Sequence, residues 1–289
     1  MKTDAFSRCH PAVNFVYFLL AIGFGVVIQH PLYMLAGLVG SAAYYLLLNG
    51  HKGVKMILLM LPVFALIAAV NPLFNTLGET TLFLLFGRPY TLEALYYGVV
   101  VGGIFLVMML WFGCYSVVLT SDKFTSLFGN WIPALSLLLV MVLRMIPNLM
   151  RKAVQISGAR KSIGKGAGEN DSKKEKILGG MTVLSALTDW ALEGSIVTAD
   201  SMRSRGYGTA KRTNFQIYRM CVRDWMLLGL TGVLTAATIL AGGMETEFIP
   251  ALEIAPLTWG FGAYCAFLLI PTALHLKEAI TWHILRSKI

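Results

Sequence analysis

The feature of this sequence that most constrains its fold is a set of long stretches without charged residues. Five stretches contain no Asp, Glu, Lys or Arg: Ala12–Ile28, Pro31–Leu48, Ala94–Leu119, Trp225–Gly243 and Ile254–Leu274. A bilayer core of about 30 Å requires roughly 20 apolar residues per helix. A sixth stretch, Met56–Val70, is shorter and contains Pro62, but it must connect two segments that return across the membrane. We therefore expect about six transmembrane helices.

The composition supports a helical membrane protein and excludes several other classes. Of the 289 residues, 56% are hydrophobic and 13% are charged, and the mean hydropathy is +0.68. Such values are not those of a soluble, disordered or coiled-coil protein. The four cysteines form no CxxC pair, and the histidines form no HExxH motif, so we expect neither a disulfide framework nor a metal site. Capping or membrane-interface roles are expected for the histidines.

The basic residues predict how the chain is oriented. Trp131–Leu143 has only 13 residues before Arg144, a length more typical of a buried or interfacial helix, so we predict that it does not span. With six spans, 23 of the 24 Lys and Arg residues then lie on one side, and only Arg88 lies on the other. The positive-inside rule places that basic side, with both termini, in the cytoplasm.

Three regions are expected along the chain. Residues 1–120 form an N-terminal region with four spans, residues 121–224 form a cytoplasmic region, and residues 225–289 form a two-span hairpin. The middle region contains a linker rich in Gly, Ser and Lys, Ser162–Lys176, followed by a helical stretch from Ile177 to Arg205 that Gly206 and Gly208 end.

Two helices of the middle region each carry an apolar stripe that leads to an arginine. On a helical wheel the first stripe leads to Arg160 and the second to Arg205. Their members are Val142, Met145, Leu149, Ala153 and Ile156, and then Leu184, Leu187, Ala191, Thr198 and Met202. Each arginine follows a small residue, Ala159 or Ser204, which permits close approach of a partner while the guanidinium binds a carboxylate in bidentate fashion. Spacing alone favours a simpler interpretation, basic residues at helix C-termini near anionic lipid.

The end of the second helix carries a resemblance to a known family. The string Thr198-Ala199-Asp200-Ser201-Met202-Arg203-Ser204-Arg205-Gly206-Tyr207-Gly208, followed by Lys211-Arg212-Thr213, resembles the second coupling motif of the T component of energy-coupling factor (ECF) transporters. This family includes cobalt-transport permease subunits. Other similar pieces are His10-Pro11, Asn71-Pro72-Leu73-Phe74-Asn75, Thr120-Ser121-Asp122-Lys123-Phe124, Ile132-Pro133-Ala134 and Val142-Leu143-Arg144. The likeness extends at least through Arg223.

The resemblance implies a non-catalytic scaffold. In this family two cytoplasmic coupling helices, each ending in an Ala-Arg-Gly-like motif, dock into grooves on a pair of ABC ATPase subunits. A separate membrane protein, the S component, binds the substrate, a vitamin or a transition-metal ion. The implied ATPase-coupling residues of this chain are Ala159, Arg160 and Lys161 in the first motif and Ser204, Arg205 and Gly206 in the second. Lys161 departs from the pattern, since a small residue is usual there.

The resemblance also implies a location and a fold. We expect an all-α polytopic protein of a bacterial or archaeal cell membrane, with about six spans, a cytoplasmic coupling-helix domain and no cofactor of its own. Neither the substrate nor the S component follows from the sequence.

Two other classes of function remain as alternatives. A self-contained secondary transporter would show inverted repeats with interrupted helices, and a membrane-embedded enzyme would show a polar catalytic pair within the spans. Neither pattern is visible. Gly164-Lys165-Gly166 is not a Walker A loop, because the lysine precedes the glycine and no GxxxxGK[ST] pattern is present. Nucleic-acid binding is disfavoured because the basic segment lacks interleaved aromatics. The glycines Gly98, Gly102 and Gly103 are expected to serve helix packing, with contact to an S component as the alternative.

Overall fold

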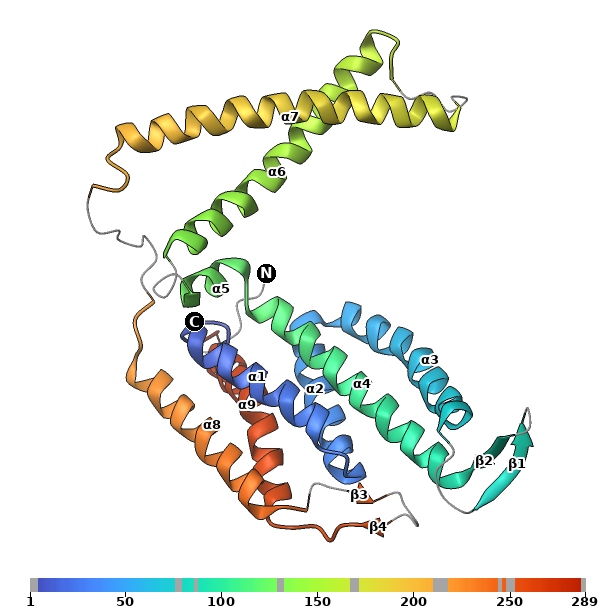
Figure 1. Cartoon of the computed structure of the whole chain (residues 1–289). Helices are drawn as coiled ribbons and strands as arrows, with labels where there is room; N and C mark the ends of the chain where they lie inside the picture. Colours follow the sequence, from blue (N-terminus) through green and yellow to red (C-terminus); the bar gives the residue numbers. More distant parts are fainter. Residues whose placement is uncertain are drawn as a thin grey trace. The chain divides into compact units, whose positions relative to one another are not determined.

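The computed structural model describes residues 5–75, 80–85, 88–128, 133–166, 172–209, 218–243, 246–247 and 253–286. These residues are mainly helical, which confirms the expected all-α class. The helices are α1 (Pro11–Val27), α2 (Pro31–Asn49), α3 (His51–Phe74), α4 (Leu92–Val118), α5 (Ser121–Phe128), α6 (Pro133–Ser162), α7 (Lys173–Ser204), α8 (Val222–Ala241) and α9 (Gly260–Arg286). Two short antiparallel hairpins join β1 (Thr81–Leu85) to β2 (Arg88–Thr91) and β3 (Thr246–Glu247) to β4 (Glu253–Ile254) (Figure 1).

The chain divides into two compact units. Unit 1 comprises Met1–Phe124 and Tyr218–Ile289, and unit 2 comprises Thr125–Ile217. The expected four-span region and closing hairpin thus pack as one body, and the middle region is inserted between them. Unit 1 contains α1 to α4, α8 and α9, whereas unit 2 contains α6 and α7.

The helices of unit 1 run alternately in opposite directions (Figure 1). At one end, the backbone N–H of His10, just before α1, donates to the carboxylate of Asp224 at the start of α8. At the other end, His30 before α2 bonds through Nε2 to the carbonyl oxygen of Ala255, just before α9. Both histidines cap their helices, because Nδ1 of each accepts the N–H two residues later, which confirms the expected capping role.

Among the residues that the structure describes, five helices are long and apolar enough to cross a membrane. They are α2, α3, α4, α8 and the first 23 residues of α9, Gly260–Trp282. α1 is also apolar, but its 17 residues extend only about 26 Å at 1.5 Å per residue. α6 is not among the membrane-crossing candidates in the described part of the chain, and the interpretation of Trp131–Leu143 as non-spanning stays a prediction. Trp131 itself lies outside the described residues.

Two helices differ in extent from the sequence prediction. α3 begins at His51 and ends at Phe74, so it continues through Pro62 and well beyond the predicted Met56–Val70. α9 begins six residues later than predicted and ends twelve residues later, at Arg286. Apolar character alone does not make Ile254–Trp259 helical, since this segment contains Pro256. The charged residues Lys277 and Glu278 do not end α9, which continues to Arg286.

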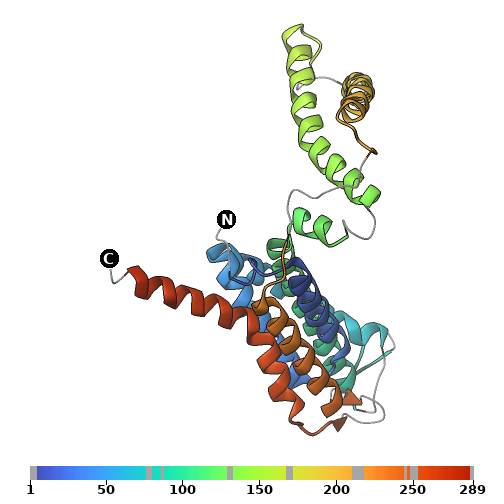
Figure 2. The same cartoon turned by 90° about the vertical axis from the view of Figure 1, so that its left-hand side faces the viewer.

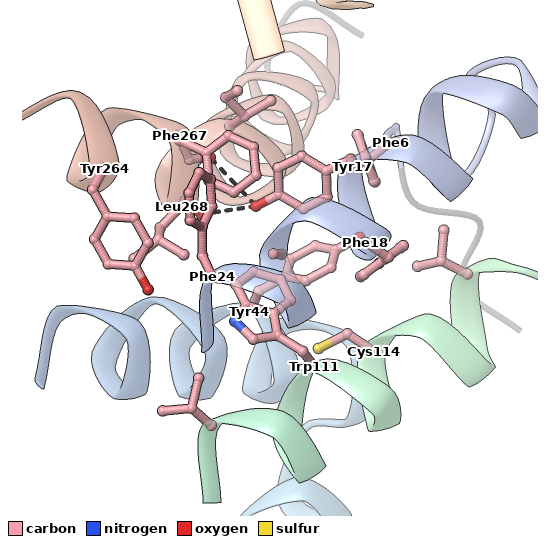
Figure 3. Close-up of a cluster of buried hydrophobic side chains, with 14 of the residues drawn as sticks. Phe6, Tyr17, Phe18, Phe24, Tyr44, Trp111, Cys114, Tyr264, Phe267 and Leu268 are labelled. Atoms are coloured by element: carbon pink, nitrogen blue, oxygen red, sulfur yellow. Dashed lines mark hydrogen bonds between the residues drawn. The ribbon is translucent and has the colours of Figure 1, made fainter. Parts of the chain in front are cut away.

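An aromatic core joins α1, α2, α4 and α9 (Figure 3). Tyr17 and Phe267 stack with their ring centroids 4.9 Å apart, and Trp111 meets Tyr17 edge to face at 5.8 Å. The Tyr17 hydroxyl donates to the carbonyl oxygens of Phe267 (3.3 Å) and Leu268 (3.4 Å). Pro271 has no N–H to bond the Phe267 carbonyl four residues earlier, and α9 bends in its middle part (Figure 2). Tyr17 therefore supplies the bond that the proline removes.

Small residues let α4 lie close to its neighbours. A Cβ atom at Gly98 would lie 2.6 Å from the carbonyl oxygen of Ala68 on α3, and one at Gly102 would lie 3.0 Å from the Phe64 ring. Gly103 faces Met34 of α2. The expected packing role of these glycines is thus confirmed, and their contacts lie within this chain.

In unit 2, α6 and α7 cross each other (Figure 1). Arg160 of α6 meets Gly179 of α7, and the Lys152 ammonium lies 5.6 Å from the centre of the Trp190 ring. Of these two contacts, the one with the later residue of α6, Arg160, has the earlier residue of α7, Gly179. The two helices are therefore antiparallel where they touch. α6 is continuous over 30 residues despite Pro147.

Candidate functional site

The end of α7 has a well-defined backbone geometry. The N–H of Tyr207 bonds to the Met202 carbonyl oxygen, and the N–H of Gly206 bonds to that of Arg203, each at 3.0 Å. This pair of bonds, with Gly206 at φ +78°, is a Schellman motif, which requires a residue that tolerates the left-handed conformation. Arg205 is the C-cap residue immediately before this glycine, and its side chain is exposed.

The end of α6 has the same motif at a different place in the sequence. The N–H of Lys165 bonds to the Arg160 carbonyl oxygen at 2.9 Å, and the N–H of Gly164 bonds to that of Lys161 at 3.1 Å. Gly164, at φ +73°, is therefore the counterpart of Gly206, and Ile163 is the counterpart of Arg205. Arg160 lies three residues earlier, inside the helix.

This difference explains the irregular first motif. Lys161 stands where the family pattern has a small residue, but in this chain Lys161 is a helical residue and needs no glycine-like backbone. The equivalence of Ala159-Arg160-Lys161 and Ser204-Arg205-Gly206 thus holds in sequence and not in local geometry. In the sequence, the residue that indicates the end of α6 is Gly164, which follows the apolar Ile163.

Arg160 and Arg205 also differ in their contacts. The Arg160 side chain is half-buried and donates through Nη1 to the Gly179 carbonyl oxygen (3.1 Å) and through Nη2 and Nε to the Lys165 carbonyl oxygen (3.3 and 3.4 Å). A guanidinium has five N–H donors, so two remain for a further acceptor. Within the described residues the structure shows neither a hydrogen bond nor an ion pair for the guanidinium of Arg205, and the residue is exposed.

The two apolar stripes predicted from the sequence lie only partly on the surface. In α6, Met145, Leu149, Ala153 and Ile156 are half-buried along the side that also carries Arg160. A second stripe with four-residue spacing is exposed on this helix: Val142, Ile146, Met150 and Val154. In α7, Leu187, Ala191 and Met202 are half-buried, whereas Leu184 and Thr198 are exposed.

The residues that hold α6 against α7 were not predicted from the sequence. The Gly179 carbonyl oxygen accepts from the Arg160 guanidinium, and Nη2 lies 3.8 Å from the Cβ position of Gly179. Trp190 receives Lys152, a cation over an aromatic face. The exposed apolar residues of α7 include Ile177, Met181, Leu184, Leu192 and Ile196. Unit 2 thus presents apolar surface on both helices, with Arg205 at one helix end.

No titratable cluster suited to a metal is found where the structure describes the chain, since no three His, Cys, Asp or Glu residues come together there. Gly164 forms a helix cap, not a phosphate-binding loop. Lys211-Arg212-Thr213 and Ile132 of the resemblance lie outside the described residues. Compared with family models and with curated proteins, the chain matches none of them.

Proposed function

We propose that this chain is the transmembrane scaffold, or T component, of an ECF-type ABC importer. In this proposal two ABC ATPase subunits bind unit 2, and an S component brings a vitamin or a transition-metal ion. Unit 1 would cross the membrane six times with both termini in the cytoplasm. The chain itself hydrolyses no ATP and holds no cofactor.

The observation that carries the proposal is the exposed Arg205 guanidinium at the C-cap of α7. The Schellman bonds fix the backbone of Arg205, which lies at the end of a 32-residue helix. The same residues carry the resemblance to the second coupling motif. An exposed guanidinium suits bidentate binding of a carboxylate in a groove of a partner.

The physical mechanism is mechanical coupling. ATP binding closes the two ATPase subunits and moves the segments docked in them. The exposed apolar residues of α6 and α7 offer a surface through which this displacement reaches the S component, which then releases its substrate inside. The contacts of Arg160 with Gly179 and of Lys152 with Trp190 keep α6 and α7 together during such a movement.

The test compares Arg205→Ala with Arg203→Ala. Both side chains are exposed and two residues apart, so they are matched in charge and accessibility. Truncating a partner-paired arginine costs about 2–5 kcal/mol, whereas a rim charge costs about 1 kcal/mol or less. Arg205→Ala should therefore weaken binding of the ATPase pair by at least about 30-fold and Arg203→Ala by less than about fivefold. Equal effects of the two changes would overturn the proposed docking role.

Arg160→Ala requires a separate measurement, because Arg160 also holds α7. Loss of its bonds to Gly179 and Lys165 loosens unit 2 even without a partner. Circular dichroism of the purified protein should show a lower melting temperature for Arg160→Ala and no change for Arg205→Ala.

Reconstitution separates this function from a self-contained transporter. The purified chain in liposomes should show neither ATP hydrolysis nor solute uptake until two ABC ATPase subunits and an S component are added. The double variant Arg160→Ala with Arg205→Ala should abolish the reconstituted activity but still insert into the membrane. Uptake by the chain alone would support the secondary transporter, and full activity of the double variant would contradict the coupling site.

A further inference from the structure

The short segment Phe6–His10 before α1 contacts the ends of several other helices of unit 1. Phe6 is fully buried, and its ring meets the rings of Tyr17, Phe18 and Tyr44 edge to face at 5.2, 6.0 and 6.4 Å. Arg8 forms an ion pair with Glu278 of α9. The segment is therefore anchored in the core through Phe6 and to α9 through Arg8.

The segment Phe6–His10 also contacts Lys123, close to the point where the chain leaves unit 1. The ammonium of Lys123 donates to the backbone oxygen of Ser7, to Ser7 Oγ (2.9 Å) and to the Val118 carbonyl oxygen at the end of α4 (2.9 Å). The first segment of unit 1 ends one residue later, at Phe124. Lys123 thus ties the exit of the chain to Ser7.

The remaining contacts lie where the chain returns to unit 1 at Tyr218. Asp224 is only 4% exposed; its Oδ1 accepts from the N–H of His10 (3.3 Å) and its Oδ2 accepts from the N–H of Cys221 (3.1 Å). Arg223 Nη2 donates to Cys9 Sγ at 3.4 Å, and the rings of His10 and Tyr218 meet at 6.3 Å. The return of the chain is thus tied to Cys9 and His10.

Two residues of opposite charge therefore hold the same short segment from two sides. A charged group removed from water is costly unless hydrogen bonds satisfy it, and both Lys123 and Asp224 find those bonds largely on backbone atoms of this segment and of the adjacent helix ends. Ordinary helix capping would need only the Val118 carbonyl for Lys123 and the Cys221 N–H for Asp224. The additional bonds to Ser7 and His10 link the two junctions.

We propose that Phe6–His10 is a junction clamp. It holds together the exit of the chain at Lys123 and its return at Asp224, so that the two connections to unit 2 move as one. Lys123 and Asp224 are positioning residues that pass displacement of unit 2 to the helices of unit 1. The role of Lys123 and Asp224 in passing on displacement rests on the proposed function, whereas the junction clamp does not.

Hydrogen exchange of the full chain in lipid nanodiscs tests the clamp without any partner. Lys123→Met should raise amide exchange at 118–124 and also at 218–224 by about tenfold, because hydrogen bonds to charged groups hold the shared segment at both places. Lys123→Arg keeps a donor and should stay near wild type, and Lys52→Met, at an exposed cation of α3, should change neither segment. Faster exchange confined to 118–124 would overturn the clamp.

A milder variant decides the matter if Lys123→Met exposes the whole of unit 1. Asp224→Asn keeps one acceptor oxygen and the side-chain size. It should raise exchange at both 218–224 and 118–124, whereas Asp189→Asn, at an exposed carboxylate of α7, should leave both unchanged. An effect of Asp224→Asn at 218–224 alone would count against the clamp.

The positioning role needs the reconstituted transporter. Lys123→Met should lower substrate uptake per ATP hydrolysed by at least about tenfold, while its affinity for the ATPase pair changes less than about twofold, because Lys123 is tied to unit 1. The positioning role would be overturned if Lys123→Met raised amide exchange at 118–124 and 218–224 but left substrate uptake per ATP hydrolysed unchanged. If the wild-type chain binds no ATPase pair, the proposed function fails, and the exchange experiment still decides the clamp.

Discussion

At the scale of single residues, Tyr17 and Pro271 act as a pair although 254 positions separate them. Pro271 leaves the Phe267 carbonyl without its helical partner, and the Tyr17 hydroxyl donates to that oxygen (Figure 3). An unsatisfied carbonyl is especially costly within a bilayer, where water cannot replace the lost bond. The tyrosine therefore makes the bend of α9 tolerable.

Tyr17→Phe should lower stability by about 1–3 kcal/mol, because it leaves the Phe267 carbonyl unpaired in the core. In a Pro271→Ala background the restored N–H of residue 271 bonds this oxygen, so the same change should cost less than half as much. Thermal unfolding in detergent, followed by tryptophan fluorescence, measures both steps of this cycle. Equal costs in the two backgrounds would show that the hydroxyl does not substitute for the missing N–H.

At the scale of secondary-structure elements, the contact of α3 with α4 depends on backbone distance. Gly98 lies so close to α3 that a Cβ atom would clash with the Ala68 carbonyl oxygen at 2.6 Å. A backbone atom cannot rotate away as a side chain can, so the two helices must separate.

Gly98→Ala should therefore destabilise unit 1 by about 1–3 kcal/mol. Gly229→Ala is the matched control, since Gly229 lies in α8 with nothing within 4 Å of its Cβ position. There the gain in helix propensity, up to about 1 kcal/mol, should leave stability unchanged or raised. Melting temperatures of the two variants in the same detergent test this. A Gly98→Ala protein as stable as the control would mean that α3 and α4 do not approach this closely.

At the scale of the whole molecule, the contacts of unit 1 gather cations at one end of its helices. Arg8, Lys123 and Arg223 all contact other residues at the end where α4 and α9 finish and α8 begins. The opposite end carries the two hairpins. β1 and β2, which begins at Arg88, connect α3 to α4, and β3 and β4 connect α8 to α9. Within unit 1, these three cations therefore lie at the end opposite to Arg88.

Cysteine labelling measures the orientation that the distribution of Lys and Arg in the sequence predicts. Single cysteines at Ser172 and Glu247, in a variant without the four natural cysteines, should react differently with an impermeant thiol reagent on intact cells. Residue 247 should label from outside, because it joins α8 to α9 at the less basic end, and residue 172 should label only after the membrane is opened. Labelling of residue 172 from outside would contradict the orientation.

The sequence by itself determined the all-α class and the approximate position of each apolar helix in unit 1. The reason is physical: a segment in a bilayer must satisfy its own backbone hydrogen bonds, so a long apolar run needs no distant partner to become a helix. α1, α2 and α4 accordingly begin and end within two residues of the predicted limits. The histidine caps were likewise local, because each involves only the next two residues.

Only the tertiary structure decided which helices share a body and what each arginine contacts. The partner of Tyr17 is 250 residues away and that of His10 is 214 residues away, and no local periodicity encodes such a pairing. Arg160 and Arg205 look equivalent in sequence, yet one sits inside α6 against Gly179 and the other caps α7 in the open. That difference arises because the bonds of Gly164 and Gly206 fix where each helix ends, and because Arg160 lies where α7 packs across α6 at Gly179.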